Sequence, residues 1–185
     1  MSNSGSLVAI ERLVLDYNLV TDKLNDEEPS VVQDIQRHLT KMLVLSCASY
    51  YEQTITEALK EYANQCSGQF ADIPNGFSVI GNRSFHQMFD FSRKEPKLKE
   101  ANKFLKPLDY FGSIFMKSLV AEISEDIERV THMSAFQEIC TLRNFLVHND
   151  LINSPVIRDK TFNDIKLLHY KALFFVELLR EKFKV

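Results

Sequence analysis

The chain is poor in the residues that interrupt regular structure. Its 185 residues include five glycines, five prolines and no tryptophan, whereas phenylalanine occurs 14 times. A many-stranded β-sandwich needs more turn residues than this, so the composition argues against that class and favours long helices. The length suits one domain, and 45% hydrophobic residues are enough to build a substantial core.

The sequence also shows no excess of basic charge and no pattern typical of a leader or a membrane segment. The formal net charge is -3, so any contact with nucleic acid has to use a local basic patch. No uncharged apolar run approaches the length that spans a bilayer, and the first residues show no basic and apolar signal regions. We therefore expect a cytoplasmic protein without a membrane partner, with a flexible polar tail over residues 1–6 and a single helical domain over residues 7–185.

Metal-binding patterns are missing as well. The three cysteines, Cys47, Cys66 and Cys140, lie far apart and form neither a CxxC motif nor a zinc pattern. Four of the five histidines lack carboxylate or cysteine partners at ligand spacing. These four are His38, His86, His132 and His169. We expect buried or half-buried thiols in a reducing compartment, and no metal or other cofactor.

Apolar residues at helical spacing predict the first elements. Steps of three and four residues mark an amphipathic helix over residues 7–24, and no Gly or Pro interrupts residues 30–66, which predicts a second, long helix. Three glycines and Pro74 break the pattern over residues 67–82. We expect a long central loop there, followed by a short aromatic helix over residues 84–91.

Capping patterns place the remaining helices. Asp109 is a candidate N-cap for a helix that apolar spacing extends to Val130. Ser134 begins a capping-box pattern, which predicts that a further helix starts there. Thr161 and Asp164 have the spacing of a capping box at the start of the last helix. The expected fold class is all-α, a helical bundle with one long central loop.

One segment concentrates positive charge. Between residues 93 and 106, six basic residues stand against two acids. The basic residues are Arg93, Lys94, Lys97, Lys99, Lys103 and Lys106. They suit an RNA backbone, because phosphates bind Lys and Arg. The alternative is a solvated helix face that covers Leu98, Ala101 and Leu105.

Three polar residues interrupt the most apolar of the predicted helices. They are Arg143, Asn144 and His148. In a helix Asn144 and His148 share a face, and Arg143 lies beside them, one turn from His148. Arg offers a permanent charge and forked donors to phosphate oxygens, and His moves protons near neutral pH. These roles suit metal-independent RNA cleavage, in which a base takes the proton of the ribose 2′-hydroxyl and a cation stabilises the phosphorane.

Glu52 is a candidate polar partner in the core. It follows a run of small and aromatic side chains in the long second helix. One alternative is an exposed glutamate on a long helix. Another is a plain helical scaffold in which Glu52 pairs with Arg143 and neither takes part in chemistry.

Three segments resemble a known family. The first, Leu142-Arg143-Asn144-Phe145-Leu146-Val147-His148, resembles the signature of HEPN domains, in which Arg and usually Asn precede His at this spacing. Ser49-Tyr50-Tyr51-Glu52 resembles the aromatic and Glu segment of the second helix in the RiboL-PSP branch. Leu108-Asp109-Tyr110-Phe111-Gly112 resembles the segment before its motif helix. The resemblance covers about residues 7–183 and implies a helical bundle that dimerises through the motif helices.

The resemblance also implies an activity. It implies a homodimeric endoribonuclease that cleaves RNA by 2′-OH transesterification at a site composed from two subunits. His148 would be the general base or acid, Arg143 the phosphate stabiliser, Asn144 the orienting residue and Glu52 a supporting residue. Related proteins act as toxins, in abortive infection and antiphage defence, or in RNA processing, so an antitoxin or a defence-system protein is an expected class of partner. Asp150 stands where paired toxins commonly carry Tyr, which argues against control through that tyrosine. The alternative is a non-catalytic HEPN dimer that serves as an RNA- or protein-binding regulatory module.

Overall fold

Helices make up the regular structure throughout the described part of the chain. The computed structural model describes residues 3–24, 27–69, 89, 104–105, 113–148 and 159–184. In these ranges the helices are α1 (Asn3–Lys23), α2 (Pro29–Gln69), α5 (Ser113–Ser124), α6 (Ile127–His148) and α7 (Phe162–Lys182). The predicted all-α class is therefore confirmed.

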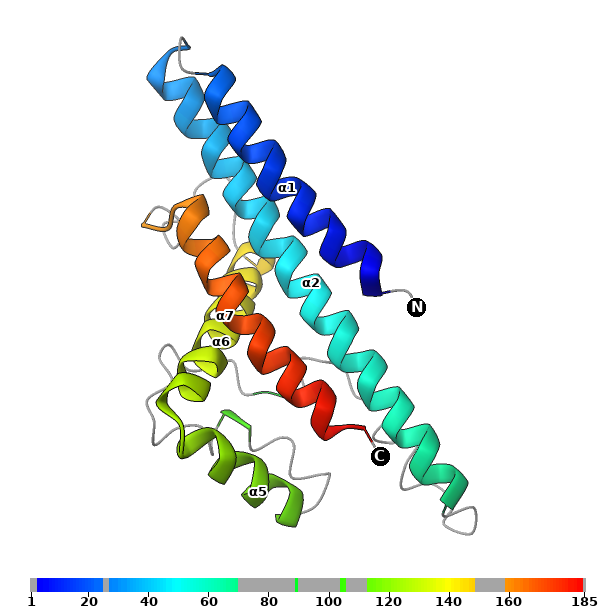
Figure 1. Cartoon of the computed structure of the whole chain (residues 1–185). Helices are drawn as coiled ribbons and strands as arrows, with labels where there is room; N and C mark the ends of the chain where they lie inside the picture. Colours follow the sequence, from blue (N-terminus) through cyan, green and yellow to red (C-terminus); the bar gives the residue numbers. More distant parts are fainter. Residues whose placement is uncertain are drawn as a thin grey trace.

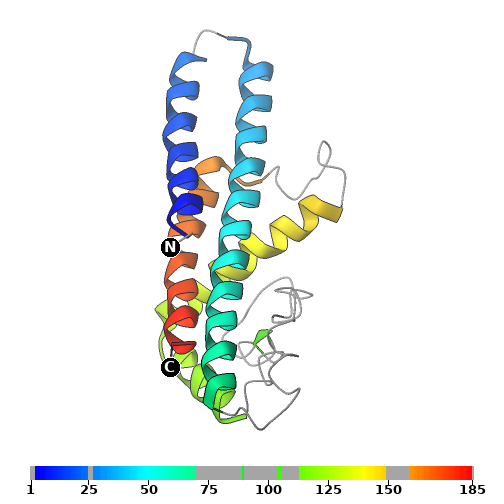
Figure 2. The ribbon, with the colours of Figure 1, turned by 90° about the vertical axis from the view of Figure 1, so that its right-hand side faces the viewer.

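Two long helices form the frame of the molecule. α1 and α2 run side by side as an antiparallel hairpin, and α7 packs along α2 (Figure 1). α6 packs against both α7 and α2, and α5 packs against α6. Figure 2 shows that α6 crosses the bundle and that its last turns project beyond α2. The end of α6, which carries the predicted motif, thus lies at the edge of the bundle.

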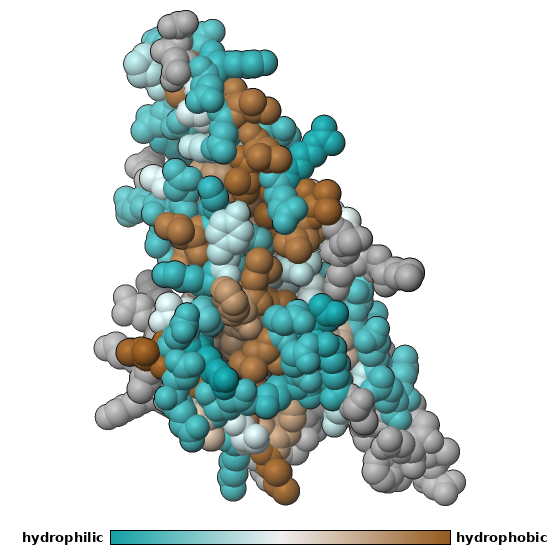
Figure 3. Space-filling view, viewed as in Figure 1, coloured by the Kyte–Doolittle hydropathy of each residue, from teal (hydrophilic) through white to brown (hydrophobic). Residues whose placement is uncertain are grey.

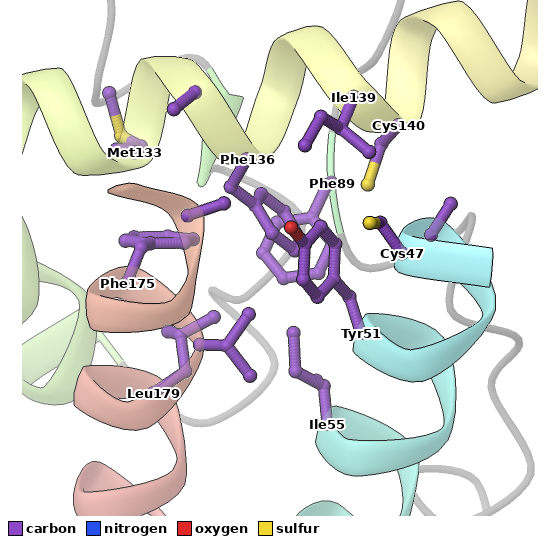
Figure 4. Close-up of a cluster of buried hydrophobic side chains, with 14 of the residues drawn as sticks. Cys47, Tyr51, Ile55, Phe89, Met133, Phe136, Ile139, Cys140, Phe175 and Leu179 are labelled. Carbon is purple, nitrogen blue, oxygen red and sulfur yellow. The ribbon is translucent and has the colours of Figure 1, made fainter. Parts of the chain in front are cut away.

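The core lies where α2, α6 and α7 meet (Figure 4). Tyr51 of α2, Phe136 of α6 and Phe175 of α7 are each no more than 1% exposed. Ring centroids are 5.5 Å apart for Tyr51 and Phe136, and 5.0 Å apart for Phe136 and Phe175. Burying one large apolar side chain contributes about 1.5–3 kcal/mol. This aromatic cluster fixes α2 against α6, one residue before Glu52 on α2 and about two turns before Arg143 on α6.

The start of the last helix is as predicted. The amide N–H of Asp164 donates to the Thr161 hydroxyl at 3.2 Å, and the Asp164 carboxylate accepts from the Thr161 amide N–H at 2.8 Å. These reciprocal bonds form a capping box, so Thr161 is the N-cap of α7. They also lower the pKa of the Asp164 carboxyl, because they favour its charged form.

Two other predicted helix boundaries are wrong. The helix expected to run to Val130 ends at Ser124, and α6 begins at Ile127. Asp126 caps α6, because its carboxylate accepts from the amide N–H of Glu128 at 2.8 Å. Ser134 is therefore not a helix start. It lies inside α6, where its hydroxyl donates to the carbonyl of Val130 at 2.7 Å.

The helix ends also differ from the sequence prediction. α1 begins at Asn3, so the helix includes residues 3–6 of the segment expected as a tail, and the Ser6 hydroxyl donates to the Gln53 side chain at 3.1 Å. α2 continues to Gln69, into the segment predicted as a loop. The rest of that loop, the aromatic helix over 84–91 and the helix start at Asp109 lie outside the described residues, apart from Phe89, which is buried.

Candidate active site

The last two turns of α6 carry the predicted motif. Leu142 and Leu146 face the core at 5% and 1% exposure, whereas Val147 is 53% exposed. Arg143 and Asn144 lie between these faces and are half-buried. His148 is the final residue of α6, and its side chain lies outside the described part. The approach of His148 to Arg143 therefore stays a prediction from their spacing.

Arg143 is held between two side chains. Its Nη2 lies 3.7 Å from Oε2 of Glu52 on α2. Its Nη1 donates to Oδ1 of Asn144 at 3.2 Å. The structure thus brings together three of the four residues that the sequence proposed for the site, from two helices that are far apart in the sequence.

The ion pair between Arg143 and Glu52 is weak enough for another anion to replace Glu52. A distance of 3.7 Å is within ion-pair range but longer than a good N–H···O hydrogen bond. The Arg143 and Glu52 side chains are 24% and 39% exposed, and an ion pair of this kind contributes only about 0–1 kcal/mol. A guanidinium oriented this way at the boundary of the bundle can bind a phosphate oxygen in addition to, or in place of, the carboxylate.

A buried pair beside Glu52 fixes α2 against α7. The Tyr51 hydroxyl lies 2.8 Å from Nδ1 of His169, and the two rings are stacked with centroids 5.8 Å apart. Burial lowers the pKa of His169 to about 4 and raises the pKa of Tyr51. His169 is therefore neutral at physiological pH, and its Nδ1 can accept a hydrogen bond from the Tyr51 hydroxyl. The pair positions the helix segment that presents Glu52.

The sequence signals this pair only in part. His169 falls on the buried stripe of α7, one turn before Ala172 and one after Ile165, both of which are fully buried. A histidine on such a stripe needs a buried partner. The partner, Tyr51, lies 118 residues away in the chain. Sequence spacing alone does not identify it.

Two cysteines also line the core near the site. Cys47 and Cys140 are free, buried and drawn close to Tyr51 in Figure 4. Burial raises the pKa of both thiols, so each stays protonated. They are packing residues, in line with the expectation from the sequence, and Cys66 lies outside the described side chains.

The remaining site predictions fall largely on other parts of the chain. The basic residues between 93 and 106 lie outside the described residues, whereas Phe104 and Leu105 of that segment are buried. Among the described residues, no group of three His, Cys, Asp or Glu side chains is placed to hold a metal ion. None of the helices in the described ranges combines the length and apolarity needed to cross a bilayer.

The RiboL-PSP-HEPN family profile matches residues 8–185, nearly the whole chain. The chain belongs to the RiboL-PSP-HEPN family. The resemblance based on three short segments is thereby confirmed. Searches of curated proteins and of solved structures found no match. HEPN domains are helical, commonly have ribonuclease activity and often dimerise and bind RNA. Ribonuclease activity is thus common in the family, and the residues around Arg143 are the candidates for it in this chain.

Proposed function

We propose that this HEPN protein is a metal-independent endoribonuclease. The observation that carries the proposal is the placement of Arg143, which Glu52 and Asn144 hold at the edge of the bundle, five residues before the last residue of α6. A plain scaffold would favour an apolar residue at this boundary, because ordering an Arg side chain costs conformational entropy for little net gain.

Each residue of the motif has a role in the proposed reaction. His148 takes the proton of a ribose 2′-hydroxyl, whose oxygen then attacks the adjacent phosphorus. Arg143 stabilises the charge that builds on the phosphorane. The bond to the 5′-oxygen breaks, and that oxygen leaves with a proton. The products are a 2′,3′-cyclic phosphate and a 5′-hydroxyl. Asn144 orients the guanidinium, and Glu52 positions it from the other side.

A dimer completes the proposed site. One imidazole cannot serve on opposite sides of the same phosphate as both base and acid, so His148 of the partner subunit supplies the second proton transfer. A two-fold interface brings the same patch of each subunit together. The end of α6 suits such an interface, because it projects beyond α2 (Figure 2) and exposes the apolar Val147.

The alternative function is a non-catalytic HEPN dimer that binds RNA or a regulatory protein. The ion pair with Glu52 favours this alternative, because a paired Arg143 also serves as a structural link between α2 and α6. The net charge of -3 favours it as well, since RNA has to be bound through local contacts. For the endoribonuclease, we propose a biological role as a toxin or an antiphage effector that an antitoxin or a defence-system protein restrains.

The test compares the parent protein with Arg143→Ala and His148→Ala. Each purified protein is incubated with single-stranded RNA in an excess of chelator. We expect cleavage by the parent and a loss of at least about a hundredfold in each variant, which is what removal of one charge-stabilising or proton-transferring group costs. If all three proteins leave the RNA intact while remaining dimers, the non-catalytic alternative is correct.

A further inference from the structure

A polar cavity lies between α1, α2 and the start of α7, away from the motif. Its volume is about 320 Å³, and its lining comes from three helices that pack together in Figure 1. We call it the amide pocket, after the side chains that distinguish it: Gln33 and Gln36 of α2 and Asn163 of α7. A cavity of this size is at the lower end of those that take small ligands, and it suits one nucleobase with its sugar.

The three amides are available to a ligand. Across the ranges that the structure describes, no hydrogen bond to another residue engages the side chains of Gln33, Gln36 or Asn163. Each carries two N–H donors and one carbonyl acceptor. Mixed donors and acceptors in one concave site match the edge of a nucleobase, which also alternates donors and acceptors. Gln and Asn pair with two atoms of adenine at once.

The charges around the amide pocket are balanced. Arg37 lines it and donates to Asp34 at 3.1 Å. Lys160 lines it and lies 2.6 Å from the Glu138 carboxylate. A pocket built to hold phosphate would present cations that no carboxylate already engages. The amides therefore dominate recognition, and Arg37 and Lys160 can still direct further N–H donors at a neighbouring phosphate.

An aromatic stack forms the apolar part of the lining. The rings of Tyr17 and Phe162 are parallel, with centroids 3.7 Å apart, and Phe162 is 1% exposed. Because Phe162 is buried under Tyr17, only the half-buried Tyr17 ring is within reach of a ligand. Single-stranded RNA is recognised by such a combination, in which an aromatic ring contacts a splayed base and polar groups read its edge.

The amide pocket lies at a defined distance from the candidate active site. Arg37 and Glu52 belong to the same unbroken helix, α2, and are 15 residues apart. At 1.5 Å per residue this is about 22 Å along the helix, with an offset of about 60° around it. A strand of RNA that has its scissile phosphate at Arg143 therefore needs several nucleotides to reach the pocket.

We propose that the amide pocket binds a nucleobase, adenine in preference to the others, of a single-stranded RNA several nucleotides from the scissile phosphate. This inference rests on the proposed function for the position of the cut, and on the pocket alone for the binding of the base. It gives an acidic protein a way to hold RNA through amide contacts and not through a basic surface.

The test measures the affinity of labelled oligoadenylate and oligocytidylate by fluorescence anisotropy, in the full-length His148→Ala protein so that the RNA stays intact. We expect tighter binding of oligoadenylate, and a loss of at least about fivefold for each of Gln36→Ala and Asn163→Ala. Asn18→Ala is the matched control, because Asn18 is an exposed amide on α1 outside the pocket, and it leaves the affinity unchanged. Gln36→Glu keeps the side-chain volume and removes the donors, so it reduces binding even if the Ala variant unfolds.

RNA cleavage assays test the amide pocket and the proposed endoribonuclease independently of each other. The pocket variants raise the KM for long RNA and leave kcat unchanged, and they leave cleavage of a dinucleotide unaffected because it cannot span the distance. Binding that depends on the amides in a protein that never cleaves RNA supports the pocket and refutes the endoribonuclease. Cleavage by a protein whose pocket variants bind both oligonucleotides like the parent overturns the pocket and leaves the endoribonuclease standing.

Discussion

The buried pair of Tyr51 and His169 gives the fold a dependence on pH that follows from the structure. His169 is 2% exposed, and its pKa is lowered from 6.5 to about 4. Below pH 6.5 the unfolded chain takes up a proton at this residue, whereas the folded protein does not do so until about pH 4. The free energy of unfolding therefore falls as the pH drops through this window, with a limiting slope of about 1.4 kcal/mol per pH unit.

The size of the effect can be worked out from the two pKa values. Between about pH 7.5 and about pH 4.5, His169 alone lowers the free energy of unfolding by about 2–3 kcal/mol. The capping box lowers the pKa of Asp164 below its usual value of 3.8, so most of its loss of stability comes at lower pH than that of His169.

The assay is urea denaturation at a series of pH values, with His169→Asn as the control. The Asn carbonyl can take the place of Nδ1 as the acceptor for Tyr51, and it does not titrate. We expect the variant to lose about 2–3 kcal/mol less than the parent over the same interval. Equal losses in the two proteins, or a pKa near 6.5 for His169 measured by NMR, would show that His169 does not cause the pH dependence.

Three further predictions concern single helices and the site. Glu52→Gln removes the charge opposite Arg143, so RNA cleavage falls about tenfold or more. The melting temperature in a thermal scan drops by no more than about 2–4 °C, because the ion pair contributes little stability. Unchanged cleavage would show that Glu52 does not position Arg143. Thr161→Ala removes the N-cap of α7 and lowers the free energy of unfolding by about 1 kcal/mol in urea; a variant as stable as the parent would contradict this role. Val147→Glu places a charge on the exposed end of α6, so we expect sedimentation to show a monomer and RNA cleavage to be lost. The control Ile127→Glu, at the exposed start of α6, stays dimeric and active. An active monomer would rule out a site shared by two subunits.

Much of the fold follows from local patterns in the sequence. The box formed by Thr161 and Asp164 depends on neighbouring residues and was therefore predictable. Ala135, Ile139 and Leu142 have the spacing of one helical face, and all three are buried on α6. Charged groups near an apolar core need partners, which makes Glu52 and Arg143 candidates from the sequence alone, and Nη2 of Arg143 lies 3.7 Å from Oε2 of Glu52.

Other features depend on competition between local choices or on contacts distant in sequence. Ser134 has the pattern of a cap, but a serine inside a helix can also donate to the carbonyl four residues earlier, as it does here with Val130. Asp126 lies in a run of acidic residues, and the sequence does not show which of them caps a helix. In the structure the Asp126 carboxylate caps α6. Tyr51 and His169 meet only through the packing of α2 against α7. The amide pocket likewise forms only when three helices assemble.

The chemistry of the RNA ends that the protein leaves in the presence of chelator tests the proposed endoribonuclease mechanism. We expect 2′,3′-cyclic phosphate and 5′-hydroxyl ends, formed by the parent dimer and absent with His148→Ala. Intact RNA in all samples, or 3′-hydroxyl ends that appear only when a divalent metal is added, would contradict it.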